Sequence, residues 1–209
     1  MVIYHKFKSV FFFKSLHLIF VSLLKTTKKT AHIEQSRPKN QMITTQRLIL
    51  KPLTYNQLIK YINCNNSLEE ELDLKPNSRT ISPELKEALE QTILPNVANK
   101  SKNYLYSTLW TAISIAENKM VGDLCIVGEP NKEGEIEIGY GTYKEFQNKG
   151  FMTEIVKGII EWTKTQPKVK FILASTDKIN TASCKVLEKN NFSIIGETDS
   201  LLNWKLDLS

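Results

Sequence analysis

One stretch of the sequence decides the fold: Phe146-Gln147-Asn148-Lys149-Gly150-Phe151-Met152-Thr153. The segment before it, residues 135–141, alternates apolar with polar or small residues, as a β-strand does. The segment after it has apolar residues at helical spacing, namely Met152, Ile155, Val156, Ile159 and Ile160. A strand, a tight turn and the start of a helix are therefore predicted to meet here.

The backbone at this helix start has the properties of an anion site. A helix leaves the N–H groups of its first turn without partners, and its dipole favours negative charge there. We therefore expect residues 148–153 to suit a phosphate or diphosphate, with Gly150 allowing a close approach. Taken alone, a glycine between a strand and a helix is equally consistent with ordinary turn chemistry. The order and spacing of further motifs must carry the prediction.

Three segments together resemble one protein family. Gln147-x-x-Gly150-x-Met152 resembles the acyl-CoA loop of the GNAT superfamily of N-acyltransferases, and its flanks resemble the RimJ/RimL-type branch, which includes ribosomal-protein N-acetyltransferases. Residues 180–192 resemble a second motif of the family, and residues 45–52 resemble its opening strand. Met152 departs from the family's Gly or Ala, and Asn191 replaces a Gly that most relatives have.

The resemblance implies an α/β fold with an α+β mixed sheet. Its central sheet is expected to be mostly antiparallel, to splay in the middle and to carry helices on both faces. The patterns predict strands at residues 48–50, 105–115, 120–127, 135–143, 171–174, 193–197 and 201–206. They predict helices after Thr54, Ser82 and Asn180. The inward residues of these helices are expected to be Leu58, Ile59, Ile62, Leu85, Ala88, Leu89, Thr92, Ile93, Ala182, Val186 and Leu187.

Charge divides the 209 residues into two predicted parts. Residues 1–41 carry seven Lys and one Arg against one Glu, a net charge of +7, which leaves −1 of the total +6 for residues 42–209. The basic balance therefore indicates no nucleic-acid partner for the domain at 42–209. Met42 is either the native start, with residues 1–41 an upstream extension of the reading frame, or that segment is a basic, membrane-touching anchor. Lys14 and His17 interrupt its apolar run, so no stable membrane insertion is expected.

Histidine and cysteine usage excludes several kinds of chemistry. All three histidines lie in residues 1–41, so the domain lacks the base of Ser-His and Cys-His hydrolases and the commonest zinc ligand. Cys64, Cys125 and Cys184 are odd in number and widely separated, which favours neither a disulfide framework nor a metal site. We expect no metal, and a reducing, cytoplasmic location.

The reaction that the resemblance implies is transfer of an acetyl group from acetyl-CoA to a primary amine. The acceptor would be a protein N-terminal α-amine or a small-molecule amine, attacking directly in a ternary complex of a monomer or homodimer. The alternative is a catalytically weak or inactive acyl-CoA-binding module. It arises because Ser175 replaces a strand carboxylate and Glu188 a helix tyrosine that many relatives carry.

The resemblance also assigns cofactor contacts. The pantetheine arm is expected beside Ile138 and Gly139, where the sheet opens. The diphosphate is expected on the backbone of Asn148, Lys149, Gly150, Phe151, Met152 and Thr153, with Gln147 closing the turn and Asn180 as a further contact. The Lys149 side chain either reaches a phosphate or is simply solvated. Asn180 also suits the N-cap of its helix.

Three residues are candidates for catalysis. The backbone N–H of Tyr140, between Gly139 and Gly141, is expected to bind the thioester oxyanion, although an ordinary sheet position is the alternative. Ser183 resembles a serine proposed in relatives to protonate the leaving thiolate. Glu137 is the first choice of general base and Glu135 the second, unless both lie on a solvated strand face and water relays the proton.

Acceptor recognition is expected from residues 63–102, from the strand around Trp110 and from the closing hairpin near Asp199 to Trp204. The acidic run at residues 69–71 is either an attractor for a cationic amine or an ordinary solvated helix face.

Overall fold

The computed structural model describes residues 41–209 of the chain. Residues 1–40 lie outside the described residues, so the expectations about the N-terminal extension stay predictions.

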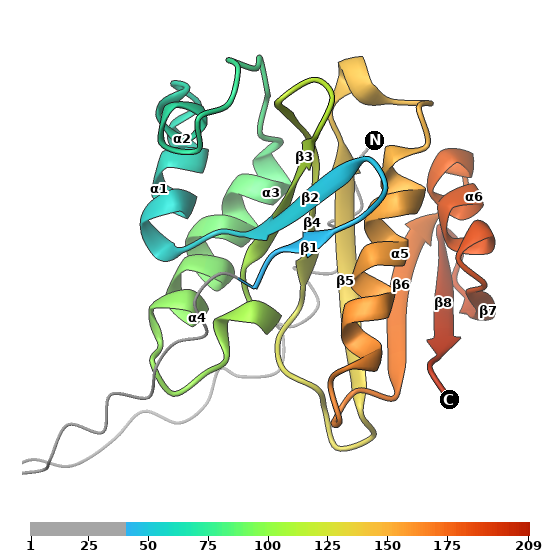
Figure 1. Ribbon diagram of the computed structural model, residues 1–209. Coiled ribbons are helices and arrows are strands. Elements are labelled where there is room, and N and C mark those ends of the chain that lie inside the picture. The colour runs from blue at the N-terminus through green and yellow to red at the C-terminus, as the bar shows by residue number, and fades with distance from the viewer. Residues whose placement is uncertain (1–40) are drawn as a thin grey trace, which may run out of the picture.

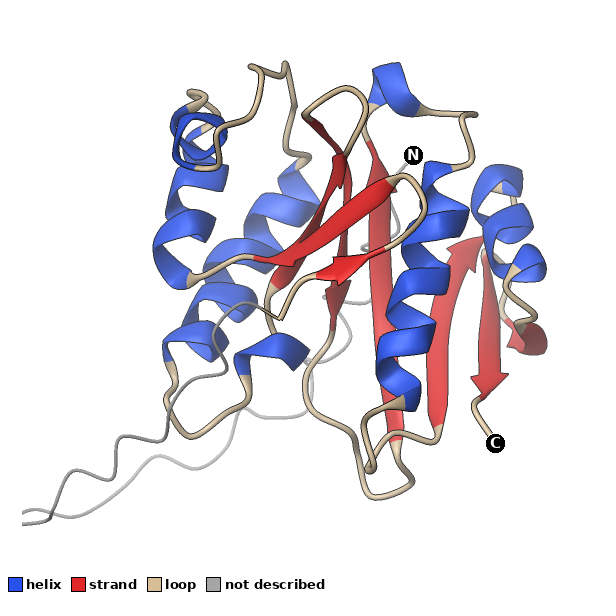
Figure 2. Ribbon diagram, viewed as in Figure 1, coloured by secondary structure: helices blue, strands red, loops and turns tan. Residues whose placement is uncertain are grey.

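Eight strands form one sheet in the order β1-β2-β3-β4-β5-β6-β8-β7 (Figures 1 and 2). Neighbouring strands are antiparallel except β5 and β6, which are parallel. This confirms the predicted mixed, mostly antiparallel sheet. The strands are β1 (Ile43–Thr44), β2 (Leu48–Pro52), β3 (Leu109–Ser114), β4 (Lys119–Ile126), β5 (Glu135–Thr142), β6 (Phe171–Asp177), β7 (Ser193–Glu197) and β8 (Leu201–Asp207).

Local side chains start the helices as the sequence predicts. Thr54 and Gln57 form a reciprocal capping box at the first helix, and Ser82 caps the helix that begins at Pro83. Asn180 accepts the N–H of Ser183 and caps the last helix. The α-helices are α1 (Tyr55–Asn63), α2 (Ser67–Glu71), α3 (Pro83–Ala88), α4 (Leu94–Ala98), α5 (Phe151–Lys164) and α6 (Thr181–Lys189). A π-helical turn, η3 (Leu89–Ile93), joins α3 to α4, and η4 (Tyr104–Tyr106) and η5 (Lys144–Phe146) are 3₁₀ turns.

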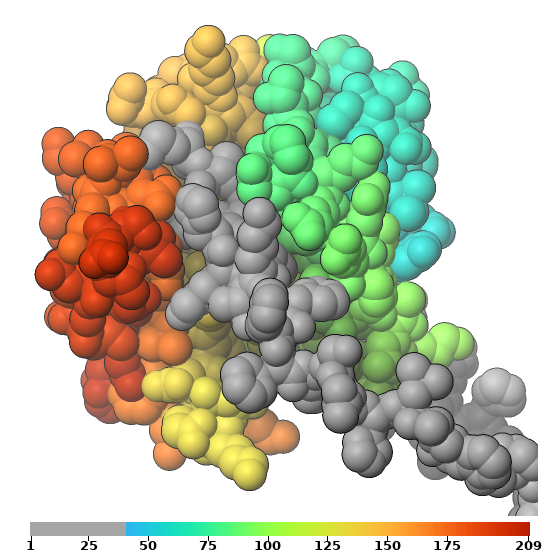
Figure 3. All heavy atoms as spheres, turned by 180° about the vertical axis from the view of Figure 1, so that it is seen from behind, coloured from blue at the N-terminus to red at the C-terminus, as the bar shows by residue number. Residues whose placement is uncertain are grey.

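Two hydrophobic cores cover the two faces of the sheet. One packs α5 and α6 against side chains such as Trp110, Leu124 and Tyr140. The other packs α1 to α4 against the opposite face of β3 and β4, through side chains such as Leu109 and Cys125. From behind, α1 to α4 form one flank of the molecule and the elements from β6 onward form the other (Figure 3).

Some expected details are wrong because tertiary contacts set the phase of a helix. Ile59 is 39 % exposed, since α1 turns Gln57, Leu58 and Tyr61 inward instead. Ala182 is exposed, and the buried α6 residues are Ser183 and Leu187. The strand expected from residue 105 begins at Leu109, after the turn η4.

Candidate active site

The sheet opens between β5 and β6. These strands pair only through residues 135–137 and 171–173, although β5 continues to Thr142 and β6 to Asp177. Beyond that point β5 pairs only with β4, and β6 pairs with β8. The parted carboxyl ends of two parallel strands are where open α/β sheets bind ligands. The splay implied by the resemblance is therefore present, and it begins at Ile138.

The backbone of β5 directs alternate residues into this opening. The carbonyl of Glu137 accepts the N–H of Val127 at 2.8 Å, and the N–H of Tyr143 donates to Val121 at 3.1 Å, both toward β4. Since backbone groups of successive strand residues point to opposite edges, those of Ile138 and Tyr140 point away from β4. The Tyr140 N–H thus lies on the open edge of β5. Gly139 lies opposite Cys125 of β4 and adds no side chain to this region.

Two residues with left-handed backbone conformations give the loop between β5 and α5 its shape. Asn148 has φ +61° and Gly150 has φ +76°, a region that Gly and Asn tolerate best. Gln147 donates from Nε2 to the carbonyl of Thr142 at 3.4 Å and so closes the turn, as expected. The chain then enters α5 at Phe151.

The first turn of α5 has no side-chain cap. Gly150 occupies the N-cap, and no side chain caps the helix. Phe151 and Met152 bury their side chains while their amides stay in the first turn, together with that of Thr153. Three amides at the positive end of a 14-residue helix favour an anion at this position.

The sequence left two alternatives open for the Lys149 side chain: contact with a phosphate, or simple solvation. In the structure it is partly exposed and contacts two neighbouring residues. Its Nζ lies 3.8 Å from a carboxylate oxygen of Glu117 and 4.9 Å from the ring centroid of Phe146. About half of the side chain is exposed, at 48 %. The cation therefore sits at the rim of the loop, partly neutralised.

Tyr140 and Ser183 are brought together on the α6 side of the sheet. The buried Tyr140 hydroxyl donates to the Ser183 carbonyl at 3.3 Å, and burial raises the pKa of this phenol well above its usual value. Asn180 is also buried and holds the Ser183 N–H at 3.1 Å. Ser183 itself is 5 % exposed.

The carboxylates lie on the other face of β5. Glu135 and Glu137 are both half-buried there. Asn131 and Lys205 hydrogen-bond Glu135 and lower its pKa, so it is a weaker base than an ordinary glutamate. Ser175 donates to Asn203 at 3.1 Å on the adjoining strand.

Comparison with known proteins identifies the family. A protein-family model described as an acetyltransferase (GNAT) domain matches residues 47–193, which span the loop, the opening and most of both cores. The chain belongs to the GNAT acetyltransferase family.

Individual relatives of this GNAT domain agree with that assignment. "Uncharacterized N-acetyltransferase YjdG" of Bacillus subtilis is 30 % identical over 95 residues, which is 46 % of this chain and 56 % of that protein. The match therefore spans little more than half the length of that relative.

Solved structures share the fold at low identity. The ribosomal-protein-S5-alanine acetyltransferase of Vibrio fischeri has a TM-score of 0.58 and 16 % identity, over 81 % of this chain and 98 % of that one. An acetyltransferase of Salmonella typhimurium, described as modifying the N-terminal serine of ribosomal protein L7/L12, has a TM-score of 0.57 and 16 % identity, over 81 % and 100 %. A RimL structure in complex with coenzyme A has a TM-score of 0.57 and 15 % identity, over 80 % and 98 %. The fold thus matches that of the RimJ/RimL-like branch.

An arginine that the sequence reading did not single out braces the loop of the GNAT domain. Arg47 donates from Nε to Glu154 at 2.6 Å and from Nη1 to the carbonyl of Lys149 at 3.0 Å. Its guanidinium carbon lies 4.7 Å from the ring centroid of Phe151. Only the family's opening motif, which contains Arg47, marked this residue.

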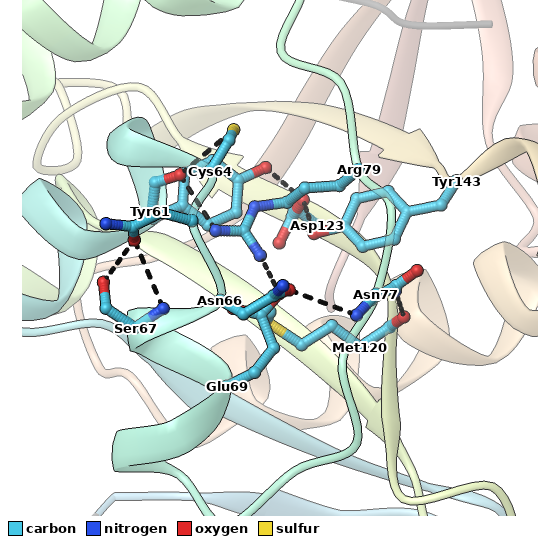
Figure 4. A network of polar contacts seen from close by, with 11 residues as sticks. Tyr61, Cys64, Asn66, Ser67, Glu69, Asn77, Arg79, Met120, Asp123 and Tyr143 are labelled. Carbon is cyan, nitrogen blue, oxygen red and sulfur yellow. Dashed lines mark hydrogen bonds and ion pairs between the residues drawn. The ribbon is translucent and has the colours of Figure 1, made fainter.

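A buried polar cluster on the α1 to α4 side was also missed (Figure 4). Tyr61 and Tyr143 donate to one oxygen of Asp123 at 2.6 and 2.7 Å. Glu69, expected to be either solvated or an attractor for amines, is 1 % exposed and paired with Arg79. Burial raises the pKa of Asp123 despite the two tyrosine hydrogen bonds.

This cluster fixes the segment between α2 and α3 of the GNAT domain onto β4. Arg79 also donates to the Tyr61 carbonyl at 3.0 Å, and Asn77 donates to the carbonyl of Met120. Trp110 and Trp204 lie in the strand and the hairpin expected to help recognise the acceptor, and their own side chains are buried in the core at 0 % and 2 % exposure.

Two kinds of feature are missing from residues 41–209. No helix in that part of the chain has the length and hydropathy needed to cross a membrane. No group of three or more His, Cys, Asp or Glu side chains is arranged there to hold a metal ion.

Proposed function

We propose that this protein transfers an acetyl group from acetyl-CoA to a primary amine, with both substrates bound at once. The observation that carries the proposal is the juxtaposition of two features: the uncapped first turn of α5 and the parted edges of β5 and β6. One fits a diphosphate, and the other offers a β-strand edge to an extended chain of amides. Coenzyme A contains both chemical groups, joined to each other.

The donor is expected to lie along β5. The amides of residues 148–153 hold the diphosphate, and the open edge at Ile138 and Gly139 holds the pantetheine arm. Asn180, at the start of α6, is a further contact. This path leads the thioester toward Tyr140, whose N–H lies on the same edge and stabilises the negative charge that develops on the thioester oxygen.

Proton handling falls to the two faces of β5. Glu137 accepts a proton from the amine, directly or through water. Glu135 is the second choice, and its lowered pKa makes it a weaker base than an ordinary glutamate. Ser183 protonates the departing thiolate. Burial raises the pKa of the Cys125 thiol to about 12, so this cysteine stays protonated and is a poor nucleophile, which favours direct attack by the amine.

A protein N-terminus is the favoured acceptor. An α-amine has a pKa of about 8 and is partly neutral at pH 7, whereas a lysine amine near 10.4 must first be deprotonated. Structural neighbours described as ribosomal-protein acetyltransferases support the same class of acceptor. Three free cysteines suit a reducing, cytoplasmic setting.

The second candidate is an acyl-CoA-binding module without turnover. It is favoured by Ser175, which is engaged with Asn203 where relatives carry a carboxylate, and by Glu188, which is exposed where they carry a tyrosine.

Release of free thiol from acetyl-CoA separates the two candidates. The full chain is incubated with acetyl-CoA and a panel of N-terminal peptides, lysine derivatives and small amines. Thiol release that depends on an acceptor, with acetyl-amide found by mass spectrometry, supports the transferase. Tight binding of acetyl-CoA without such release over the whole panel supports the binding module, and no binding at all contradicts both.

A further inference from the structure

We propose that Arg47 is a positioning residue for the diphosphate site, acting through the main-chain carbonyl of Lys149. The inference rests on the proposed function and assigns a role to a residue far from the loop in sequence. Arg47 and Glu154 are 107 residues apart, and the arginine lies in the turn between β1 and β2.

The backbone around Arg47 is itself fixed. Its carbonyl accepts the N–H of Ile115 at 3.0 Å, and the turn that contains it is closed by the N–H of Thr45, which donates to the carbonyl of Leu48 at 2.9 Å. The guanidinium therefore extends from an anchored turn, although 44 % of the side chain is exposed. Arg47 belongs to neither hydrophobic core.

The contact with Lys149 sets the direction of the next amide. The Lys149 carbonyl and the Gly150 N–H belong to one planar trans peptide and point in opposite directions. By holding the carbonyl at 3.0 Å, Arg47 directs the Gly150 N–H away from itself. Gly150 has φ +76° and no Cβ, so without this hydrogen bond its peptide plane is free to rotate.

Glu154 holds the Arg47 side chain in place, and the guanidinium in turn balances the charge of the Glu154 carboxylate. The carboxylate accepts the Arg47 backbone N–H at 2.8 Å, the Arg47 Nε at 2.6 Å and the Thr45 hydroxyl at 2.7 Å. Partial burial alone would raise the pKa of Glu154, but these hydrogen bonds and the arginine charge lower it. An ionised carboxylate one turn into α5 opposes a diphosphate, and Arg47 offsets that charge.

Only an arginine suits this position. The guanidinium meets Glu154 through Nε, Lys149 through Nη1 and the Phe151 ring through its face. A lysine offers one compact ammonium, which cannot reach all three partners together.

The test compares donors with and without the diphosphate. Affinity for CoA is measured by calorimetry, and kcat and KM are measured with acetyl-CoA and with S-acetyl-pantetheine, which lacks the diphosphate. We expect Arg47→Ala to weaken CoA binding and raise the KM for acetyl-CoA by roughly tenfold, the scale of one hydrogen bond to a charged group. The kcat with acetyl-CoA and both constants with S-acetyl-pantetheine stay near wild type, and Arg47→Lys recovers only part of the loss.

Two further variants make the result specific. Lys164→Ala breaks an exposed ion pair with Glu161 at the other end of α5 and leaves CoA affinity unchanged. The double variant Arg47→Ala with Glu154→Gln still binds CoA weakly, because the hydrogen bond from Arg47 to the Lys149 carbonyl is still missing. Full recovery of CoA affinity in the double variant would assign the effect to charge alone and overturn the positioning role of Arg47.

The remaining outcomes are distinct from one another. Wild-type CoA affinity in Arg47→Ala, or an equal loss with S-acetyl-pantetheine, contradicts the role of Arg47 and leaves the proposed function standing. Failure of the wild-type chain to bind CoA removes the proposed function itself. Thermal unfolding of each variant confirms that the protein measured is folded.

Discussion

The Tyr140 hydroxyl and the Ser183 carbonyl lie 3.3 Å apart and join the open edge of β5 to the first turn of α6. One residue thereby combines two functions: its ring and hydroxyl are structural, and its backbone N–H lies at the opening. The same contact positions Ser183, whose own N–H is held by Asn180.

Tyr140→Phe separates the two functions of Tyr140. It removes the hydrogen bond but keeps the N–H, so we expect a loss of about 0.5–1.5 kcal/mol in the free energy of unfolding and near-normal kcat/KM. Denaturant titration and steady-state kinetics check this. A hundredfold loss of kcat in a folded variant would instead place the phenol in the chemistry.

Ser183→Ala tests protonation of the thiolate. We expect kcat to fall by about a hundredfold to a thousandfold, the lower part of the range for loss of an acid catalyst, while the affinity for acetyl-CoA stays the same. Ser175→Ala is the matched control, because that hydroxyl contacts Asn203 and has no assigned role. Equal effects of the two changes would argue against a special role for Ser183.

Gly150→Ala tests the left-handed turn before α5. A Cβ there meets nothing nearer than Arg47 Nη2 at 3.6 Å, so the cost is backbone strain of about 1–2 kcal/mol. Gly128 has φ +88° with open space around it, so Gly128→Ala carries the same strain away from the loop. Both variants should lose similar stability, and only Gly150→Ala should bind CoA more weakly. Equal CoA affinity in the two variants would contradict the role of the turn.

Asp123→Asn tests the buried cluster through pH. Burial raises the folded-state pKa of Asp123, so its contribution to stability is fully present below the unfolded value of 3.8 and is lost as pH rises through the folded value. Asparagine keeps an acceptor for both tyrosines and cannot ionise. We expect the unfolding free energy of the variant to fall less than that of wild type as pH rises from about 4. Identical pH profiles from urea titrations would show that ionisation of Asp123 does not destabilise the folded state.

Glu154→Gln should show the opposite sign. The folded-state pKa of Glu154 is lowered, so the carboxylate stabilises the fold above the unfolded value of 4.5, and this contribution disappears as pH falls through the folded value. Wild type should therefore be the more stable protein at pH 7 and should converge with the variant in acid. A constant gap between the two across the acid range would count against this assignment.

Local signals in the sequence predicted the elements that frame the site. The capping residues Thr54, Ser82 and Asn180 fixed three helix starts, because a cap depends on residues within one turn. The glycine before α5 and the apolar spacing after it located the loop. The left-handed Asn191 also shows that asparagine serves where most relatives carry glycine, at φ +63°.

Contacts between residues far apart in the sequence were not predicted from its local patterns. No local sequence pattern pairs Arg47 with Glu154. The acidic run at residues 69–71 has the pattern of a solvated helix face, and its burial depends on the ion pair between Arg79 and Glu69. The inward turn of Tyr61 depends on Asp123, 62 residues away. Such partners are set by how the sheet and helices pack, which periodicity alone does not specify.

The central claim is that the amides before and within the first turn of α5 bind the diphosphate of coenzyme A. A titration of ¹⁵N-labelled protein with CoA, followed by NMR, observes those amides one by one. We predict that the largest shifts fall on residues 148–153, with a second group at residues 138–141. Saturating CoA that leaves the amides of residues 148–153 unmoved would contradict the account.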